Sequence, residues 1–301
     1  MTLRLGARGS ALSLSQAGLI RGALAGTADV EIVTIRTTGD RLSAAGSPIE
    51  WKGDFTRELD EALLSSRIDL AVHSLKDVPS DLPEGLILAA VPQREDPRDV
   101  LVSEPRRTFV ELPAAARVGT SSPRRRAQLL AARPDLDVCE ARGNVDTRIR
   151  RLREGKWDAL VLARAGLARL GRLSEVCDVF PESAMLPAVG QGALAVVARR
   201  EDRRVGDLLR DLDDRASHAE VLAERAFLSA LQAGCRAPVA ALARCSGGRL
   251  RLTGAAFSGD GGEGFREERE GSPERAEAIG RELGEALLAR GAAAWLLSER
   301  T

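Results

Sequence analysis

The stretch VGTSSPRRRAQLL, residues 118–130, contains a short apolar strand, a turn and the start of a helix. Ser122 is suited to cap that helix and Pro123 to occupy its first position. Residues 124–126 are all arginine, although the positive end of a helix dipole disfavours exposed cations by about 0.3–1 kcal/mol each. Guanidiniums, hydroxyls and backbone N–H groups together indicate a site for a ligand with several negative groups. The alternative is a solvated basic helix start.

The same order of strand, turn and helix recurs along the chain. We predict strands over residues 3–7, 30–37, 69–75, 85–91, 98–103, 116–120, 136–141, 158–163 and 192–199, and helices over 13–24, 55–66, 123–132 and 145–154. This alternation predicts the α/β class with largely parallel sheets. The remainder has an α+β order, with a helix over 216–232, strands near 238–244, 249–257 and 264–270, and a final helix near 273–290.

The pattern restarts near residue 98 without a low-complexity linker. We therefore expect a first lobe formed by 1–95 with 190–212, a second lobe over 96–189 and a third domain over 213–301. Lobes tied by paired crossing strands form a hinge, which is a natural place for a ligand cleft.

Composition restricts the function classes. The 301 residues carry 44 acidic and 44 basic side chains, and only 3% are aromatic, which disfavours a nucleic-acid partner. No signal peptide and no apolar run of 18 residues is found, so we expect a cytoplasmic chain without a membrane partner. The four cysteines lack metal-ligand spacing, so we expect no metal.

HSLKDVP, residues 73–79, follows the apolar strand DLAV directly. Ligands of α/β sheets bind beyond the carboxyl ends of strands, and Lys76 is one of only three lysines in the chain. Lys76 beside Asp77 suits an anion anchor next to a proton-transfer group. A polar loop with a local ion pair is an equally weighted alternative.

Arginine also follows the next two predicted strands. ARGNVDTRIRRLREG, residues 141–155, offers Arg142 and Arg148, and ARAGLARLG, residues 163–171, offers Arg164 and Arg169. Three successive junctions thus present arginine at one edge of a sheet, which indicates a polyanion cleft.

Two later turns admit two interpretations each. PAVGQGALA, residues 187–195, is either a crossing point between domains or a plain turn. QAGCRAPVA, residues 232–240, places Cys235 beside Arg236, so this cysteine is either a buried structural thiol or a reactive one.

Taken in order, these motifs resemble the porphobilinogen deaminase (hydroxymethylbilane synthase) family. The resemblance runs to about residue 240 and rests on ARGSALSLSQA, TTGD, WKGDFTRELDEALL, HSLKDVPS, VGTSSPRRRAQL, RGNVDTRIRRL, LARAGLARLG, PAVGQGALA and GCRAPVA. It implies two lobes similar to periplasmic binding proteins and a third, smaller domain. It also implies a monomer that adds four porphobilinogen molecules head to tail, with loss of ammonia, onto a dipyrromethane cofactor held by a thioether to Cys235.

The resemblance also implies roles for individual residues. Asp77 is the catalytic acid. The cofactor-binding residues are Cys235, Lys76, Ser122, Arg124 and Arg125. The substrate-binding residues are Arg8, Ser10, Phe55, Thr120, Ser121, Arg142, Arg148, Arg169 and Gln191. The other three cysteines, Cys139, Cys177 and Cys245, match no functional position.

Two residues differ from the family pattern, and two alternative functions are weighed against the resemblance. Gly9 and Pro123 replace a long polar residue and a leucine that are common in the family, which affects local loop geometry. A non-enzymatic two-lobed anion-binding or sensing protein would share the arginines but would not need Asp77 or Cys235. A nucleic-acid binder is disfavoured by the neutral charge.

Overall fold

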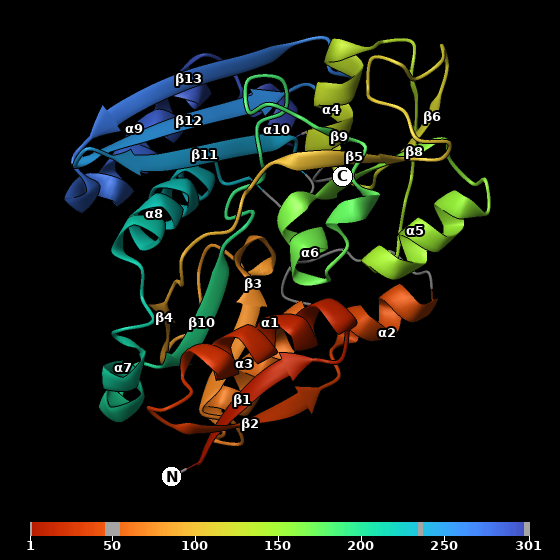
Figure 1. The fold of residues 1–301 in the computed structure, drawn as a ribbon. Helices are drawn as coiled ribbons and strands as arrows, with labels where there is room; N and C mark the ends of the chain where they lie inside the picture. The colour runs from red at the N-terminus through yellow and green to blue at the C-terminus, as the bar shows by residue number, and fades with distance from the viewer. Residues whose placement is uncertain (1, 46–54, 234–236, 298–301) are drawn as a thin grey trace. The chain divides into compact units, whose positions relative to one another are not determined.

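A computed structural model describes residues 2–45, 55–233 and 237–297, which form two compact units (Figure 1). The first unit comprises Met1–Glu95 and Gly192–His218, and the second comprises Asp96–Gln191 and Ala219–Thr301. The chain therefore passes between the units three times. Among the described residues, no helix is long and apolar enough to cross a membrane.

The first unit is built on one five-stranded sheet in the order β2-β1-β3-β10-β4. Its strands are β1 (Thr2–Arg8), β2 (Asp29–Ile35), β3 (Leu70–Ser74), β4 (Leu86–Ala90) and β10 (Leu194–Arg199). β1 is parallel to β2 and β3, whereas β10 is antiparallel to both β3 and β4. Strand β10 belongs to the second stretch of this unit, so the sheet is completed only when the chain returns.

The described part of the first unit contains four α-helices that lie wholly within it. They are α1 (Ala11–Ala23), α2 (Thr38–Ala45), α3 (Arg57–Leu64) and α7 (Arg203–Leu209). Ala17 and Ile20 of α1 pack with Leu3 and Leu5, which alternate along β1. The polar residues that follow β1 and β3 lie at the carboxyl ends of these strands, outside this apolar core.

The second unit contains a second five-stranded sheet in the order β7-β6-β8-β5-β9. Its strands are β5 (Asp99–Ser103), β6 (Arg117–Gly119), β7 (Asp137–Cys139), β8 (Ala159–Ala163) and β9 (Asp178–Val179). β6 is parallel to β7 and β8, and β5 is antiparallel to β8 and β9. The carboxyl ends of β6, β7 and β8 therefore share one sheet edge, as the sequence analysis expects.

Helices cover both faces of this sheet. Leu129 of α4 (Pro123–Ala132) packs on one face, and Ile149 of α5 (Val145–Arg153) and Leu167 of α6 (Arg164–Arg169) pack on the other. Each helix begins just beyond the carboxyl end of a strand, so its first residues lie at the shared edge.

The rest of the second unit is a three-stranded antiparallel sheet, β11-β12-β13, with helices. Its elements are β11 (Val239–Ser246), β12 (Arg249–Phe257), β13 (Gly264–Gly271), α8 (Arg215–Ala230), α9 (Ala276–Ala289) and α10 (Ala293–Leu297). Phe227 of α8 and Leu283 of α9 fill the core on one face. On the other face, Leu186 packs with Ala240 and Leu242.

The predicted class, two parallel-rich α/β sheets and a C-terminal α+β region, is confirmed. The helix predicted near 273–290 is confirmed as α9, but it is not the final one because α10 follows it. Helices α2, α6 and α7 were also not predicted. Strand β7 is also shorter than the predicted 136–141. The division into three domains at the expected boundaries stays a prediction.

Candidate functional site

A short turn after β3 carries Lys76 and Asp77. Residues Leu75–Asp77 form one turn of 3₁₀ helix, in which the backbone N–H of Val78 donates to the Leu75 carbonyl at 3.0 Å. The N–H of Leu75 donates to the carbonyl of Ala193, also at 3.0 Å, and the Leu75 side chain is buried. The turn is thus fixed to the segment that leads into β10. Lys76 and Asp77 are half-buried at the carboxyl end of β3.

Arg8, the last residue of β1, is held by a carboxylate and an aromatic ring. Its Nε and Nη2 donate to Asp40 Oδ1 at 3.0 and 2.5 Å, and its guanidinium carbon lies 4.0 Å from the ring centroid of Phe55. A Cβ atom at Gly39 would lie 2.4 Å from a carbon of that ring, so only glycine permits this approach. The structure therefore brings the predicted residues Arg8 and Phe55 together.

Asp40 is ionised because of its partners. Burial alone would raise the pKa of its carboxyl, but the hydrogen bond and charge of Arg8 and the bonds from Thr37 lower that pKa below its usual value. The carboxylate stabilises the guanidinium in one orientation.

Hydrogen bonds join the ends of β1 and β3 through the start of α1. Ser10 caps α1 by accepting from the N–H of Ser13 at 3.2 Å, and the Ser13 hydroxyl accepts from the N–H of Arg8 at 3.0 Å. The buried side chain of Gln16 donates to the Ser74 hydroxyl at 2.8 Å. Sequence analysis did not single out Gln16 or Ser74; a buried glutamine on the helix face that packs on β1 was the available signal.

The start of α4 has the predicted local structure. Ser122 caps the helix, accepting from the N–H of Arg125 at 3.4 Å, and Pro123 occupies its first position. The Thr120 hydroxyl accepts from the N–H of Ser122 at 3.2 Å, and the Ser121 hydroxyl accepts from the N–H of Ala141 at 3.1 Å. These three predicted hydroxyls thus fix the turn between β6 and α4.

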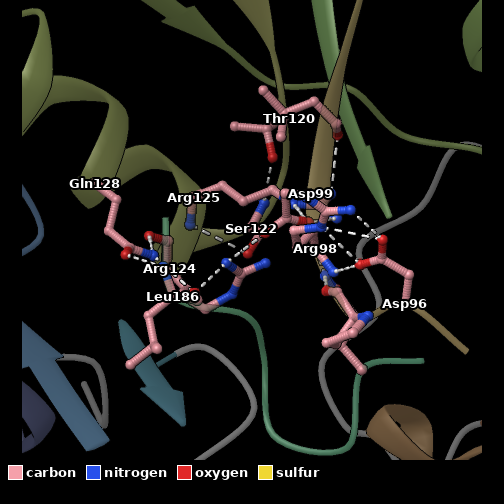
Figure 2. Close-up of polar contacts among 12 residues, drawn as sticks. Asp96, Arg98, Asp99, Thr120, Ser122, Arg124, Arg125, Gln128 and Leu186 are labelled. Atoms are coloured by element: carbon pink, nitrogen blue, oxygen red, sulfur yellow. Dashed lines mark hydrogen bonds and ion pairs between the residues drawn. The ribbon is translucent and has the colours of Figure 1, made fainter. Parts of the chain in front are cut away.

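Asp99, the first residue of β5, is the partner of the two arginines at this helix start (Figure 2). Arg124 Nη1 lies 2.7 Å from Asp99 Oδ2, and Arg125 Nε and Nη2 lie 3.0 and 2.7 Å from Asp99 Oδ1. The exposed fractions are 3% for Arg124, 6% for Arg125 and 0% for Asp99. Burial would raise the pKa of Asp99, but the two guanidiniums lower it far below its usual value. A buried carboxylate therefore offsets the cost of placing cations at the helix start.

Gln191 connects the same carboxylate to the segment that precedes β10. Its side chain is 1% exposed, and its Nε2 donates to Asp99 Oδ1 at 2.9 Å and to the Pro97 carbonyl at 2.6 Å. The preceding N–H, of Gly190, donates to Glu224 Oε2 of α8 at 2.6 Å. Sequence analysis identified Gln191 but neither Asp99 nor Glu224.

The remaining predicted arginines follow β7 and β8 in the chain. Arg142 is half-buried and pairs with Glu140 at 2.5 Å, and its carbonyl accepts from Arg151 at 3.4 Å. Arg148 lies in α5 and is partly buried, and Arg169 is the last residue of α6. Arg169 lies at the end of α6 that is farther from β8, and the predicted row of arginines along one sheet edge stays a prediction.

The predicted attachment residue, Cys235, lies outside the described residues, between the end of α8 and the start of β11. Cys139, Cys177 and Cys245 are partly buried. Among the described ranges, no group of three or more histidine, cysteine or acidic side chains is arranged to bind a metal.

Together these features define a class: α/β proteins in which basic helix starts and an acidic turn lie beyond the carboxyl ends of parallel strands, an arrangement for anionic ligands. The chain belongs to the porphobilinogen deaminase family. The model "Porphobilinogen deaminase, dipyromethane cofactor binding domain" matches residues 3–207, and "Porphobilinogen deaminase, C-terminal domain" matches residues 218–289.

Curated relatives agree with this assignment over nearly the whole chain. Porphobilinogen deaminase of Rubrobacter xylanophilus is 54% identical over 294 residues, covering 97% of this chain and 95% of the relative. That of Syntrophomonas wolfei is 48% identical over 302 residues, covering 99% of each. A solved structure, the periplasmic VFT2 domain of Bordetella pertussis BvgS, is 15% identical with a TM-score of 0.41, covering 70% of this chain and 86% of that one. The family assignment favours the enzyme over the non-enzymatic alternative.

Proposed function

We propose that this chain is a transferase of tetrapyrrole biosynthesis. It joins four porphobilinogen molecules head to tail, with loss of ammonia, onto a dipyrromethane primer and releases hydroxymethylbilane by hydrolysis. The observation that carries this proposal is the relationship, at 54% identity over 97% of the chain, to a protein named for this activity.

The buried arginines of the second unit fit the carboxylate-bearing dipyrromethane. Arg124 Nε is buried and has no hydrogen-bond partner among the described residues, so a donor remains available beside the pair with Asp99. In this proposal Ser122, Arg124 and Arg125 bind carboxylates of the group, and Lys76 has the same role. When bound through a thioether to Cys235, the dipyrromethane supplies the pyrrole carbon to which the first substrate unit is joined.

Asp77 is the proposed catalytic acid. As a carboxylic acid it donates a proton to the departing amine of porphobilinogen, and as a carboxylate it then stabilises the electron-poor carbon that the amine leaves behind. Two observations support this role: the residue is half-buried at the end of β3, and its turn is fixed by the Leu75 hydrogen bond to Ala193. A fixed turn keeps the carboxyl in place through successive additions.

The other predicted residues are proposed to bind substrate. Each pyrrole of the product carries an acetate and a propionate, so the growing chain gains negative charge with every addition. Guanidiniums suit these carboxylates because they form two parallel hydrogen bonds. The proposed substrate residues are Arg8, Ser10, Phe55, Thr120, Ser121, Arg142, Arg148, Arg169 and Gln191.

Intact mass under denaturing conditions tests the proposal. We expect the purified chain to exceed its sequence mass by one dipyrromethane unit and Cys235→Ser to lack the excess. Cys245→Ser, which changes a partly buried cysteine of the same unit, is the control and should keep the excess mass. An active chain at the bare sequence mass would contradict the scheme.

The proposal also covers the cellular location, the oligomeric state and the partners of the enzyme. We place it in the cytoplasm as a monomer, with porphobilinogen as its partner and neither nucleic acid nor membrane. Sedimentation at micromolar concentration measures the oligomeric state directly, and a concentration-independent single-chain mass is the expected result.

A further inference from the structure

The carboxylate of Asp99 is saturated by three side chains. Oδ1 accepts from Arg125 at two nitrogens and from Gln191, and Oδ2 accepts from Arg124. Asp99 itself is fixed because β5 pairs with β8 at this position, opposite Ala163. A saturated carboxylate on a central strand sets the direction of each guanidinium that it binds.

Each of the two arginines also donates a hydrogen bond to a backbone carbonyl. Arg124 Nη1 donates to Leu186 at 2.7 Å, and Arg125 Nη1 donates to Val161 at 2.9 Å. Among the described residues, Asp99 is also the one carboxylate paired with either arginine. Two adjacent buried cations therefore share a single negative partner, and a positive surplus remains for a ligand.

Helix α4 is attached to the C-terminal sheet of the same unit. Gln128 and Leu186 exchange hydrogen bonds at 2.7 and 3.1 Å, and Leu186 packs on that sheet. At the β12–β13 turn, a Cβ atom on Gly261 would lie 2.2 Å from the Ala127 carbonyl, so the turn contacts α4 closely. The arginines are thus placed relative to β11 and β12.

A second connection passes through the segment before β10. Glu224 of α8 is fully buried and accepts from the N–H groups of Gly190 at 2.6 Å and Ala243 at 2.8 Å. Gln191, next to Gly190, donates to Asp99. Helix α8 ends at Ala230, five residues before Cys235. Hydrogen bonds therefore link the helix that leads to the proposed attachment residue with the carboxylate that orients the arginines.

We propose that Asp99 is a positioning residue for the attached primer, assisted by Gln191. It fixes Arg124 and Arg125 in one orientation relative to α8 and β11, the elements that flank Cys235 in the sequence, and thereby holds the primer in position for the addition of substrate units. This inference rests on the proposed function, which assigns the two arginines to the primer's carboxylates.

Asp99→Asn is the test, because it removes the charge and keeps the size. Asp135→Asn, which breaks an exposed pair with Arg133 in the same unit, is the matched control. For Asp99→Asn we expect the loaded fraction, read from denatured mass, to fall at least about twofold. Among loaded chains we expect kcat to fall about tenfold or more while KM stays within threefold. A purely structural role would reduce the yield of folded protein and leave kcat per loaded chain unchanged.

A melting experiment tests the same residue without substrate or primer. In Asp99→Asn the two cations lack their carboxylate, so sulfate should bind there and raise the Tm by roughly 2–4 °C more than in Asp135→Asn at matched ionic strength. A wild-type chain with neither added mass nor turnover would refute the proposed function. The sulfate experiment would still test the role of Asp99 in that case, because it needs neither primer nor substrate.

Three results would overturn the inference: kcat per loaded chain within twofold of wild type, a KM change without a kcat change, or no sulfate effect specific to Asp99→Asn. Should Asp99→Asn fail to fold, Gln191→Met removes one donor to Asp99 and leaves both ion pairs. That variant should lower kcat per loaded chain about threefold, and an unaltered kcat would refute the proposal.

Discussion

Helices α4 and α5 begin in the same way but place their arginines in opposite surroundings. Both follow a parallel strand, and both have a side-chain cap, Ser122 in α4 and Asn144 in α5. In α4, the side chains of Arg124 and Arg125 are 4% and 8% exposed against the fully buried Asp99. In α5, Arg150 and Arg153 pair with carboxylates at the surface.

The ion pairs of α5 illustrate the difference. Arg150 and Glu154 lie 2.9 Å apart with side chains that are 64% and 54% exposed, and Arg153 pairs with Glu175 at 2.8 Å. Exposed pairs contribute little because water already solvates both charges, whereas a buried pair becomes costly when one partner is removed. A cap motif thus fixes where a helix begins, whereas the burial of its arginines depends on the partners that other elements place beside them.

The largest expected effect is on stability. Asp99→Ala leaves two buried cations without a partner and should lower the free energy of unfolding by about 3–5 kcal/mol. Glu154→Ala removes the corresponding carboxylate of an α5 pair and should cost about 0.5 kcal/mol or less. Urea unfolding followed by circular dichroism measures both. Equal costs for the two variants would break the comparison.

An intermediate effect is expected on substrate binding. Arg142 is 36% exposed at the side chain and pairs with a more exposed Glu140. Arg142→Leu should raise KM for porphobilinogen about tenfold through loss of a charge-assisted hydrogen bond. It should lower the free energy of unfolding by less than about 1 kcal/mol.

Arg150→Leu is the control for this measurement, since Arg150 is an exposed arginine of α5, the helix that follows Arg142. Its KM should match that of wild type. If both variants raise KM equally, the effect is one of general charge, and Arg142 does not bind a substrate carboxylate.

The smallest expected effect is a difference in how salt changes the coupling energy of the two ion pairs. A double-mutant cycle on Arg150 and Glu154 should give a coupling of about 0.3–0.5 kcal/mol that vanishes in 1 M NaCl, where the Debye length is about 3 Å. The coupling between Asp99 and Arg125 should persist in the same salt because neither group is in contact with bulk water. A salt-insensitive α5 pair would show that its exposure does not control its energy.

Local signals in the sequence were sufficient for the helix starts. Ser122 and Pro123 act through hydrogen bonds and dihedral angles within one turn, so the structure of that turn follows from adjacent residues. In α5, the spacing of Ile149 and Leu152 predicts their burial, and both are buried.

Long-range partners could not be predicted in this way. Asp99 lies 25 residues before Arg124 in an apolar strand, and nothing in its neighbours distinguishes it from a surface aspartate. The contact between Gln16 and Ser74 spans 58 residues, and that between Gly190 and Glu224 spans 34. The family resemblance supplied residue roles but not these contacts, which depend on how the strands pair. Short helices such as α2 and α10 carry too few turns for a periodic pattern.

The position of β10 has a consequence for synthesis on the ribosome. Every strand of the second sheet lies between residues 99 and 179, so a nascent chain can finish that sheet while the first still lacks the strand between β3 and β4. Until Leu194–Arg199 emerges, the inner edges of β3 and β4 stay open to other extended segments. The sheet whose first strands are translated earliest is therefore completed after the second five-stranded sheet, and its unfinished edges are where chaperones would be needed.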